Sequence, residues 1–310
     1  MKTIEYLTGP NAELFRPAIV AGIAIALQAS LLSVPVVLRR LAFIGQGVSH
    51  AAFGGVGLAV ILGLMGTGAG GAQNAGALAL IAAFCIATAI GIAWLSGKGG
   101  AREDTVIGIF LVGAMALGAI LLHLHRRIGA AGGPTPPVED LLFGSIFAVT
   151  PGDAQIAAWL TGAIALALWW FRRPLLFWSF DEPAAEAFGV PTARMKLLLL
   201  VLLAVSIVAS MKLAGVILAT ALLVLPGATA LNISRRLGVV LALSITIGLI
   251  GMLGGLVLSF ETDLPPGPAV VGVLCAIYAL AWPASRMARA TQRTESLSEV
   301  AQSSLSRGAG

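Results

Sequence analysis

The sequence predicts an all-α polytopic membrane protein, a bundle of eight or nine transmembrane helices. Two observations of composition carry the prediction: 58% of the 310 residues are hydrophobic and only 11% are charged. Soluble domains carry roughly 25% charged residues, and the mean hydropathy here is +0.97. The third observation is that the apolar residues are grouped in runs close to the roughly 20 residues that a spanning helix requires.

Nine apolar runs are candidates for spanning helices. They lie at roughly 17–38, 43–65, 75–96, 105–124, 154–171, 196–211, 213–231, 238–260 and 268–285. The sixth and seventh are separated by little more than Lys212. They could be two tilted spans, or one span and a re-entrant segment, so the expected number is eight or nine.

Small residues indicate close packing of these helices. The chain holds 38 glycines, and small side chains allow transmembrane helices to approach closely. Its two cysteines, Cys85 and Cys275, both lie in apolar runs. We expect both to be buried thiols, because free cysteine is usually buried, and they indicate no disulfide framework.

The distribution of basic residues predicts the orientation. With nine spans and a cytoplasmic C-terminus, most of the lysines and arginines fall on the cytoplasmic side, as the positive-inside rule requires. The cytoplasmic set is Arg39, Arg40, Lys98, Arg102, Arg172, Arg173, Arg194, Lys196, Arg235, Arg236, Arg286, Arg289, Arg293 and Arg307; the outer set is Lys2, Arg16, Arg126, Arg127 and Lys212. The N-terminus would then lie outside, provided that the sixth and seventh runs both cross. Basic residues placed at helix ends as topology signals do not suggest a nucleic-acid partner.

The chain divides into a membrane domain and a polar tail. Residues 1–290 form the predicted transmembrane domain, with Gly- and Pro-rich breaks at 129–137 and 262–268. Residues 291–310 are polar and predict a disordered cytoplasmic extension.

The cytoplasmic connection from Arg172 to Lys196 contains signals for a short, capped helix. Asp181 is placed as an N-cap, and Gly189 as a C-cap with Pro191 just beyond it. We expect about two turns of helix at the membrane surface. Such a helix suits docking into a groove of a cytoplasmic partner; the alternative is an ordinary amphipathic interfacial helix.

The segment from Leu38 to Gly57 carries the first candidate site. Gln46 and His50 are four residues apart, so on a helix they share one face. Polar groups inside the membrane usually face a bundle interior or a pathway. His50 is therefore a candidate metal-contacting or gating group, the alternative being a histidine that bonds to a neighbouring helix. Ser49 belongs to the same candidate pathway set, although its neighbouring glycines favour a packing hydroxyl.

Other polar residues give weaker signals. His123 and His125 are two apart, so on a helix they point in different directions and favour an interfacial or docking role over a metal site. Glu103 and Asp104 begin the fourth run, where negative charge complements the helix dipole. Glu139, Asp140 and Asp153 could meet a basic binding protein or be solvated. Pro226 is expected to break or kink the seventh run.

Four blocks of the sequence resemble the permease subunits of bacterial ABC importers for zinc, manganese and iron. The blocks are Leu38 to Gly55, Arg102 to Gly118, Asp140 to Asp153, and Phe180 to Ala230. The first is similar to the family pattern R-x-x-x-x-G-D-x-x-S-H-x-x-x-x-G. Within the fourth, the matching residues are Asp181, Ala185, Gly189, Gly215, Leu225, Pro226 and Ala228.

The resemblance implies an importer subunit of the bacterial inner membrane. It implies a second permease copy or a paralogue, two cytoplasmic ATPase subunits and an extracellular metal-binding protein. The short cytoplasmic helix would be the coupling helix, with Asp181, Glu182, Ala185 and Gly189 as the coupling residues. The chain has no phosphate loop of its own, so we expect it not to hydrolyse ATP alone. The resemblance further implies a transport subunit that is not an enzyme, with no permanent cofactor and a divalent metal ion, zinc, manganese or iron, as cargo.

One departure concerns the candidate pathway. The family commonly has Asp where this chain has Gln46, and a carboxylate with an imidazole is a better divalent-metal pair than an amide with an imidazole. Three interpretations stay open. The site is looser and still passes the metal, a different partner permease supplies the carboxylate, or the cargo is a metal chelate or another solute.

Two other classes of function fit the sequence less well. A secondary transporter would need acidic residues inside the membrane for ion coupling, and no run holds one well inside it. An intramembrane enzyme would need paired carboxylates, H-E-x-x-H or a nucleophile dyad, and the runs contain none of these.

Overall fold

Every regular element in the part of the chain that the computed structural model describes, residues 12–64, 75–98, 103–128, 144 and 149–283, is a helix. The helices are α2 (Ala12–Leu38), α3 (Ala42–Ile61), α4 (Ala75–Lys98), α5 (Glu103–Ile128), α7 (Pro151–Trp170), α8 (Arg172–Phe180), α9 (Glu182–Ala187), α10 (Thr192–Ile233), α11 (Leu237–Thr262) and a last helix, Pro266–Pro283. The predicted tail after residue 290 lies outside these residues.

Among the described residues, eight helices are long and apolar enough to cross a membrane, and the number is nine if α7 and α8, bent by 73° between them, count as one further span. The nine long helical segments coincide with the nine apolar runs of the sequence. The all-α, eight-to-nine-span prediction is therefore confirmed.

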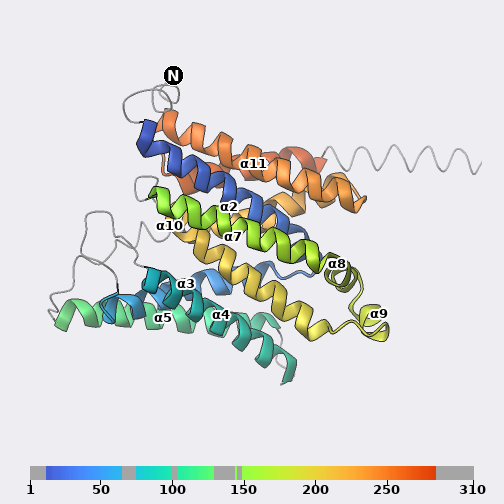
Figure 1. Ribbon diagram of the computed structural model, residues 1–310, viewed down its shortest axis with the longest axis horizontal. Helices are drawn as coiled ribbons and strands as arrows, with labels where there is room; N and C mark the ends of the chain where they lie inside the picture. The colour runs from blue at the N-terminus through green and yellow to red at the C-terminus, as the bar shows by residue number, and fades with distance from the viewer. Residues whose placement is uncertain (1–11, 65–74, 99–102, 129–143, 145–148, 284–310) are drawn as a thin grey trace, which may run out of the picture.

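Helix α2 is the central helix of the bundle. It packs against α10, α11 and α7, and Figure 1 shows it between α11 and α7. Hydroxyl groups bond to its backbone across the helix interfaces: Thr161 donates to the carbonyl of Ala24, and Ser244 to that of Ser30, both at 2.9 Å. Interhelical bonds of this kind contribute on average about 0.6 kcal/mol each.

Helices α3, α4 and α5 form a second group beside this centre (Figure 1). Here small residues permit a close approach. A Cβ placed on Gly118 of α5 would lie 2.6 Å from the carbonyl oxygen of Phe53 in α3, so only glycine fits at that position.

The chain reverses direction inside α10, at Gly215. That residue has φ 64° and ψ 175°, a conformation open essentially to glycine alone. The segment before it starts just after α9. The segment after it brings the Gly227 amide to the Ser33 hydroxyl at 2.8 Å, near the C-terminal end of α2, and the next residue after α2, Arg39, contacts α9. The sixth and seventh runs therefore cross the bundle in opposite directions.

Two expectations differ from the structure. Pro226 does not break the helix, which continues to Ile233, and the break within α10 is at Gly215 instead. Near Pro226 the Ser33 hydroxyl of α2 donates to the carbonyl of Val224 at 3.3 Å and accepts from the Gly227 amide at 2.8 Å. Cys85 is buried as expected, but Cys275 is exposed on the outside of the bundle.

Candidate functional site

Gln46 and His50 lie on the only open stripe of a helix that is otherwise packed inside the protein. Most residues of α3 are buried, from Ile44 to Val60. Gln46 and His50 are half-buried, and Phe43, which shares their stripe, is 67% exposed. A helix packed on its other sides by α4, α5 and α10 thus presents an amide and an imidazole to the outside of the single chain.

The two side chains contact each other directly. The Gln46 Nε2 atom lies 2.8 Å from Nε2 of His50. With the amide donating, the His50 Nε2 lone pair accepts and the ring proton resides on Nδ1. The nitrogen that would bind a metal is therefore occupied by a hydrogen bond from Gln46.

Ser49 does not join this pair. It is fully buried, and its hydroxyl donates to the carbonyl of Gly45 at 2.8 Å. This local bond satisfies the hydroxyl inside the helix packing, so the structure places Ser49 apart from the open stripe.

The remaining candidate ligands are scattered over the described part of the chain, which contains no group of three or more His, Cys, Asp or Glu residues placed to hold a metal. His123 and His125 both lie on α5, so they point to different sides of it. Glu103 and Asp104 begin α5, as expected from the helix dipole. Glu139 and Asp140 lie outside the described residues.

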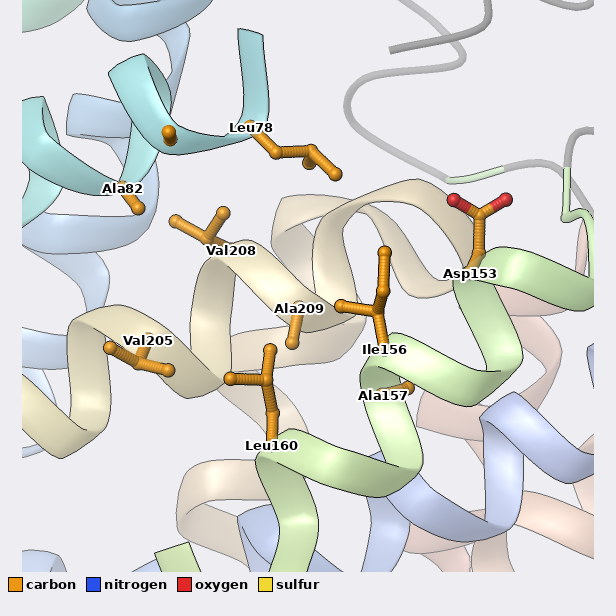
Figure 2. A pocket seen from close by; sticks show the side chains of 10 residues that line it. Leu78, Ala82, Asp153, Ile156, Ala157, Leu160, Val205, Val208 and Ala209 are labelled. Carbon is orange, nitrogen blue, oxygen red and sulfur yellow. The ribbon is translucent and has the colours of Figure 1, made fainter. Parts of the chain in front are cut away.

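A half-open pocket of about 280 Å³ lies between α4, α7 and α10. Figure 2 shows Leu78, Ile156, Leu160 and Val208 around it, with Asp153 at its edge. The Asp153 carboxylate is bonded to the amide and hydroxyl of Thr150 at 2.7 and 2.6 Å, in a capping box that starts α7. This apolar pocket offers no ligand set for a metal.

Helix α9 has the two caps that the sequence predicts. The Asp181 carboxylate accepts from the Ala184 amide at 3.0 Å. At the other end Gly189 has φ 79°, and the amides of Gly189 and Val190 donate to the carbonyls of Glu186 and Ala185, both at 2.9 Å. This is a Schellman motif, which requires a left-handed residue after the helix.

The predicted coupling residues contribute to the structure of α9 and its contacts, although Asp181 and Gly189 are also exposed. Ala185 is fully buried, Asp181 and Gly189 form the caps, and Glu182 pairs with Arg39, the residue that follows α2. The prominent outward residue is Phe188, 80% exposed, with its ring 5.8 Å from that of Phe177. Sequence reasoning missed Phe188; the available signal was a large aromatic residue at the end of a short helix otherwise made of Ala, Glu and Pro.

Arg39 joins α2 to α8 and α9. Its guanidinium lies 4.4 Å from the ring centre of Trp178 and forms an ion pair with Glu182. Trp178 Nε1 also donates to Glu182, at 3.2 Å. Burial of the Glu182 carboxyl group opposes ionisation, but the hydrogen bonds from Arg39 and Trp178 outweigh it and lower the pKa of Glu182 below its ordinary value.

Residues 11–284 of this helical bundle match the model of the ABC 3 transport family. The chain belongs to that family. The match covers all the helices described above, including the open stripe of α3 and the capped helix α9.

Individual known proteins are similar to the chain over most of their length. The manganese transport system membrane protein MntC of Halalkalibacterium halodurans is 31% identical, over 86% of this chain and 85% of its own. The high-affinity zinc uptake system membrane protein ZnuB of Haemophilus influenzae is 28% identical, over 84% and 93%. A solved structure of PsaBC from Streptococcus pneumoniae in complex with a Fab is 29% identical, with a TM-score of 0.75 over 90% and 94%.

Proposed function

We propose that this ABC 3 family chain is the permease subunit of an importer that moves a divalent transition metal ion, zinc, manganese or iron, into the cell. The observation that carries the proposal is the Gln46–His50 pair on the one open stripe of α3. Relatives named for manganese transport and zinc uptake support this class of cargo.

The open stripe also supports a pathway shared between two permeases. An amide and an imidazole facing lipid would be costly, whereas facing a second copy or a paralogue they would line a joint passage. Gln46 and His50 from one subunit would then meet the corresponding side chains of the other. The membrane lipid would contact the apolar outer faces of the remaining helices.

For metal to bind, the Gln46 amide must release the His50 nitrogen. Neutral imidazole is a good ligand for zinc and other transition metals, and an amide oxygen is a weak one. A rotation of the Gln46 side chain that turns its oxygen toward the ion would free Nε2 and add an oxygen donor. The pair would thus act as a transient site that holds the ion weakly, which suits passage more than storage.

The capped helix α9 is the feature that favours a partner subunit that hydrolyses ATP. We place α9 and the C-terminus on the cytoplasmic side, in line with the basic residues at that end, and assign ATP hydrolysis to partner subunits that receive α9. Phe188 projects from its end as an apolar side chain suited to a groove. An extracellular metal-binding protein would deliver the ion at the opposite end.

Element-resolved uptake tests the proposal. Cells with and without this chain are grown in metal-limited medium, and the accumulated metals are measured by mass spectrometry. Loss of one divalent metal supports the proposal and identifies the cargo. If the accumulated amount of every metal is unchanged, the proposal is contradicted and the second candidate is favoured, a permease for a metal chelate or another solute. The observation that favours this candidate is the uncharged side chain of Gln46.

A further inference from the structure

Arg39, Trp178 and Glu182 form a three-residue cluster, here called the Arg39 clamp, at the end of the bundle where α9 lies. The Arg39 guanidinium stacks on the Trp178 ring, donates to the Trp178 carbonyl at 3.4 Å and pairs with the Glu182 carboxylate. Trp178 Nε1 bonds to the second oxygen of that carboxylate at 3.2 Å. Each member therefore contacts the other two.

The clamp connects α9 to the centre of the bundle. Glu182 is the first residue of α9, and Trp178, in α8, is fully buried. The Arg39 side chain is 20% exposed and that of Glu182 is 40% exposed, so the ion pair is partly shielded from water. Helix α9 is only six residues long, and a displacement of it acts directly on this ion pair.

The chain after Arg39 forms a tight corner that leads straight into α3. Arg40 has φ 57°, and the amides of Arg40 and Leu41 donate to the carbonyls of Val37 and Val36 at 3.1 and 2.9 Å. Helix α3 then begins at Ala42. Because Gln46 lies about 6 Å along the axis from Ala42, a shift of Arg39 reaches the open stripe of α3 through a short, fully hydrogen-bonded segment.

We propose that Arg39 is the positioning residue that transmits movement of α9 to the Gln46–His50 stripe. The inference rests on the proposed function, in which α9 receives movement from an ATPase and the stripe receives the cargo. The planar guanidinium is suited to this role because it stacks on the ring and binds the carboxylate in fixed geometry, which a lysine ammonium does not. A displacement of Glu182 thus moves Arg39 and, with it, the turn between α2 and α3.

The first test compares ATP hydrolysis with metal uptake. The complete complex, with its ATPase and binding protein, is reconstituted in vesicles, and both rates are measured for Arg39→Gln and for Arg173→Gln, which removes an exposed arginine from α8. We expect Arg39→Gln to assemble and hydrolyse ATP while the metal moved per ATP falls about fivefold. Arg173→Gln keeps the wild-type ratio. The inference is overturned if Arg39→Gln loses assembly, ATP hydrolysis and uptake in parallel while Arg39→Lys moves the wild-type amount of metal per ATP. The Arg39 clamp would then only stabilise the structure.

A double-mutant cycle tests whether the movement of α9 reaches Arg39 through Glu182. Arg39→Gln, Glu182→Gln and the double variant are compared by their uptake per ATP. If the two residues act through each other, the double variant is no worse than Arg39→Gln alone. Additive losses would show separate roles and contradict transmission through the ion pair.

A second readout is independent of the cargo. Phe43, in the first turn of α3, is 67% exposed, and it is replaced by cysteine in a Cys275→Ala background because Cys275 is exposed while Cys85 is buried. We expect the rate of maleimide labelling to differ between the nucleotide-free and vanadate-trapped complex, and Arg39→Gln to abolish that difference. An unchanged difference in Arg39→Gln overturns the inference. If the wild-type complex hydrolyses ATP but moves no metal, only the proposed cargo is refuted. The labelling experiment still tests whether Arg39 transmits movement from α9 to α3.

Discussion

The Gln46 side-chain amide lies 2.8 Å from Nε2 of His50, one helical turn further along α3. The imidazole lone pair that a metal would use is therefore already engaged within the same subunit. A carboxylate at this position could not donate such a bond, since an ionised carboxylate only accepts. Replacing Asp by Gln thus changes both the charge of the stripe and the resting state of its histidine.

Gln46→Asp should strengthen metal binding. The new carboxylate adds a charged oxygen ligand, and unit charges 4 Å apart interact by about 4 kcal/mol at an effective dielectric constant of 20. After losses to desolvation, we expect the Kd of the purified permease for Zn²⁺ to fall by about tenfold. Isothermal titration calorimetry measures it, with Gln46→Asn as the uncharged control. An equal Kd for Gln46→Asp and Gln46→Asn would show that residue 46 does not face the ion.

Gly189→Glu should impair coupling to the ATPase. Gly189 has φ 79°, so any residue with a Cβ is strained there, by about 1 kcal/mol or more. Gly189→Asn is the matched control, because asparagine tolerates this conformation better than glutamate. We expect metal-stimulated ATP hydrolysis to be lost in Gly189→Glu and largely retained in Gly189→Asn. Unchanged hydrolysis in Gly189→Glu would refute the assignment of α9.

Phe188→Ala should weaken docking of the ATPase without destabilising the permease. Phe188 is 80% exposed, so little is lost from the fold, whereas a buried aromatic anchor contributes about 2 kcal/mol or more to an interface. We expect affinity for the ATPase, measured by surface plasmon resonance, to fall by about tenfold or more. Trp159→Ala removes a similarly exposed aromatic residue, 81% exposed on α7, and should leave this affinity unchanged. Equal effects of the two variants would contradict the docking role.

The Arg39–Glu182 ion pair should be insensitive to pH in the physiological range. The folded-state pKa of Glu182 is lowered, so its stabilising contribution is present above the unfolded pKa of about 4.3 and is lost as the pH falls through the folded pKa. Thermal unfolding of wild type and Glu182→Gln is compared from pH 8 to pH 3. We expect the difference in Tm to stay constant from pH 8 to 5 and to shrink below pH 4.3. A difference that changes between pH 8 and 5 would show that another group titrates with the pair.

The sequence predicted much of the fold because hydrophobic runs and helix caps are local signals. The nine runs correspond to nine helical segments, and Asp181 and Gly189 cap α9 as expected. Local signals misplace features that depend on neighbours. Pro226 lies inside the helix, where Ser33 of another helix bonds to the backbone on either side of it, while the reversal occurs at Gly215, one of many glycines in apolar sequence.

The candidate site was predictable only in part. The four-residue spacing of Gln46 and His50 placed them on one face, and the structure brings them into contact. The burial of Ser49, the exposure of Cys275 and the contact of Glu182 with Arg39 depend on which helices pack together. The Arg39 clamp joins residues 139 and 143 positions apart, which no local pattern reveals.

The most direct test of the account is metal uptake by the reconstituted complex with wild-type permease and with His50→Ala, resolved by element. The account predicts that His50→Ala assembles with its ATPase and binding protein but moves the metal at least about tenfold more slowly, because the imidazole ligand of the pathway is gone. Undiminished uptake would show that the ion does not pass His50. Failure of the variant to assemble would make His50 a structural residue and contradict the central claim.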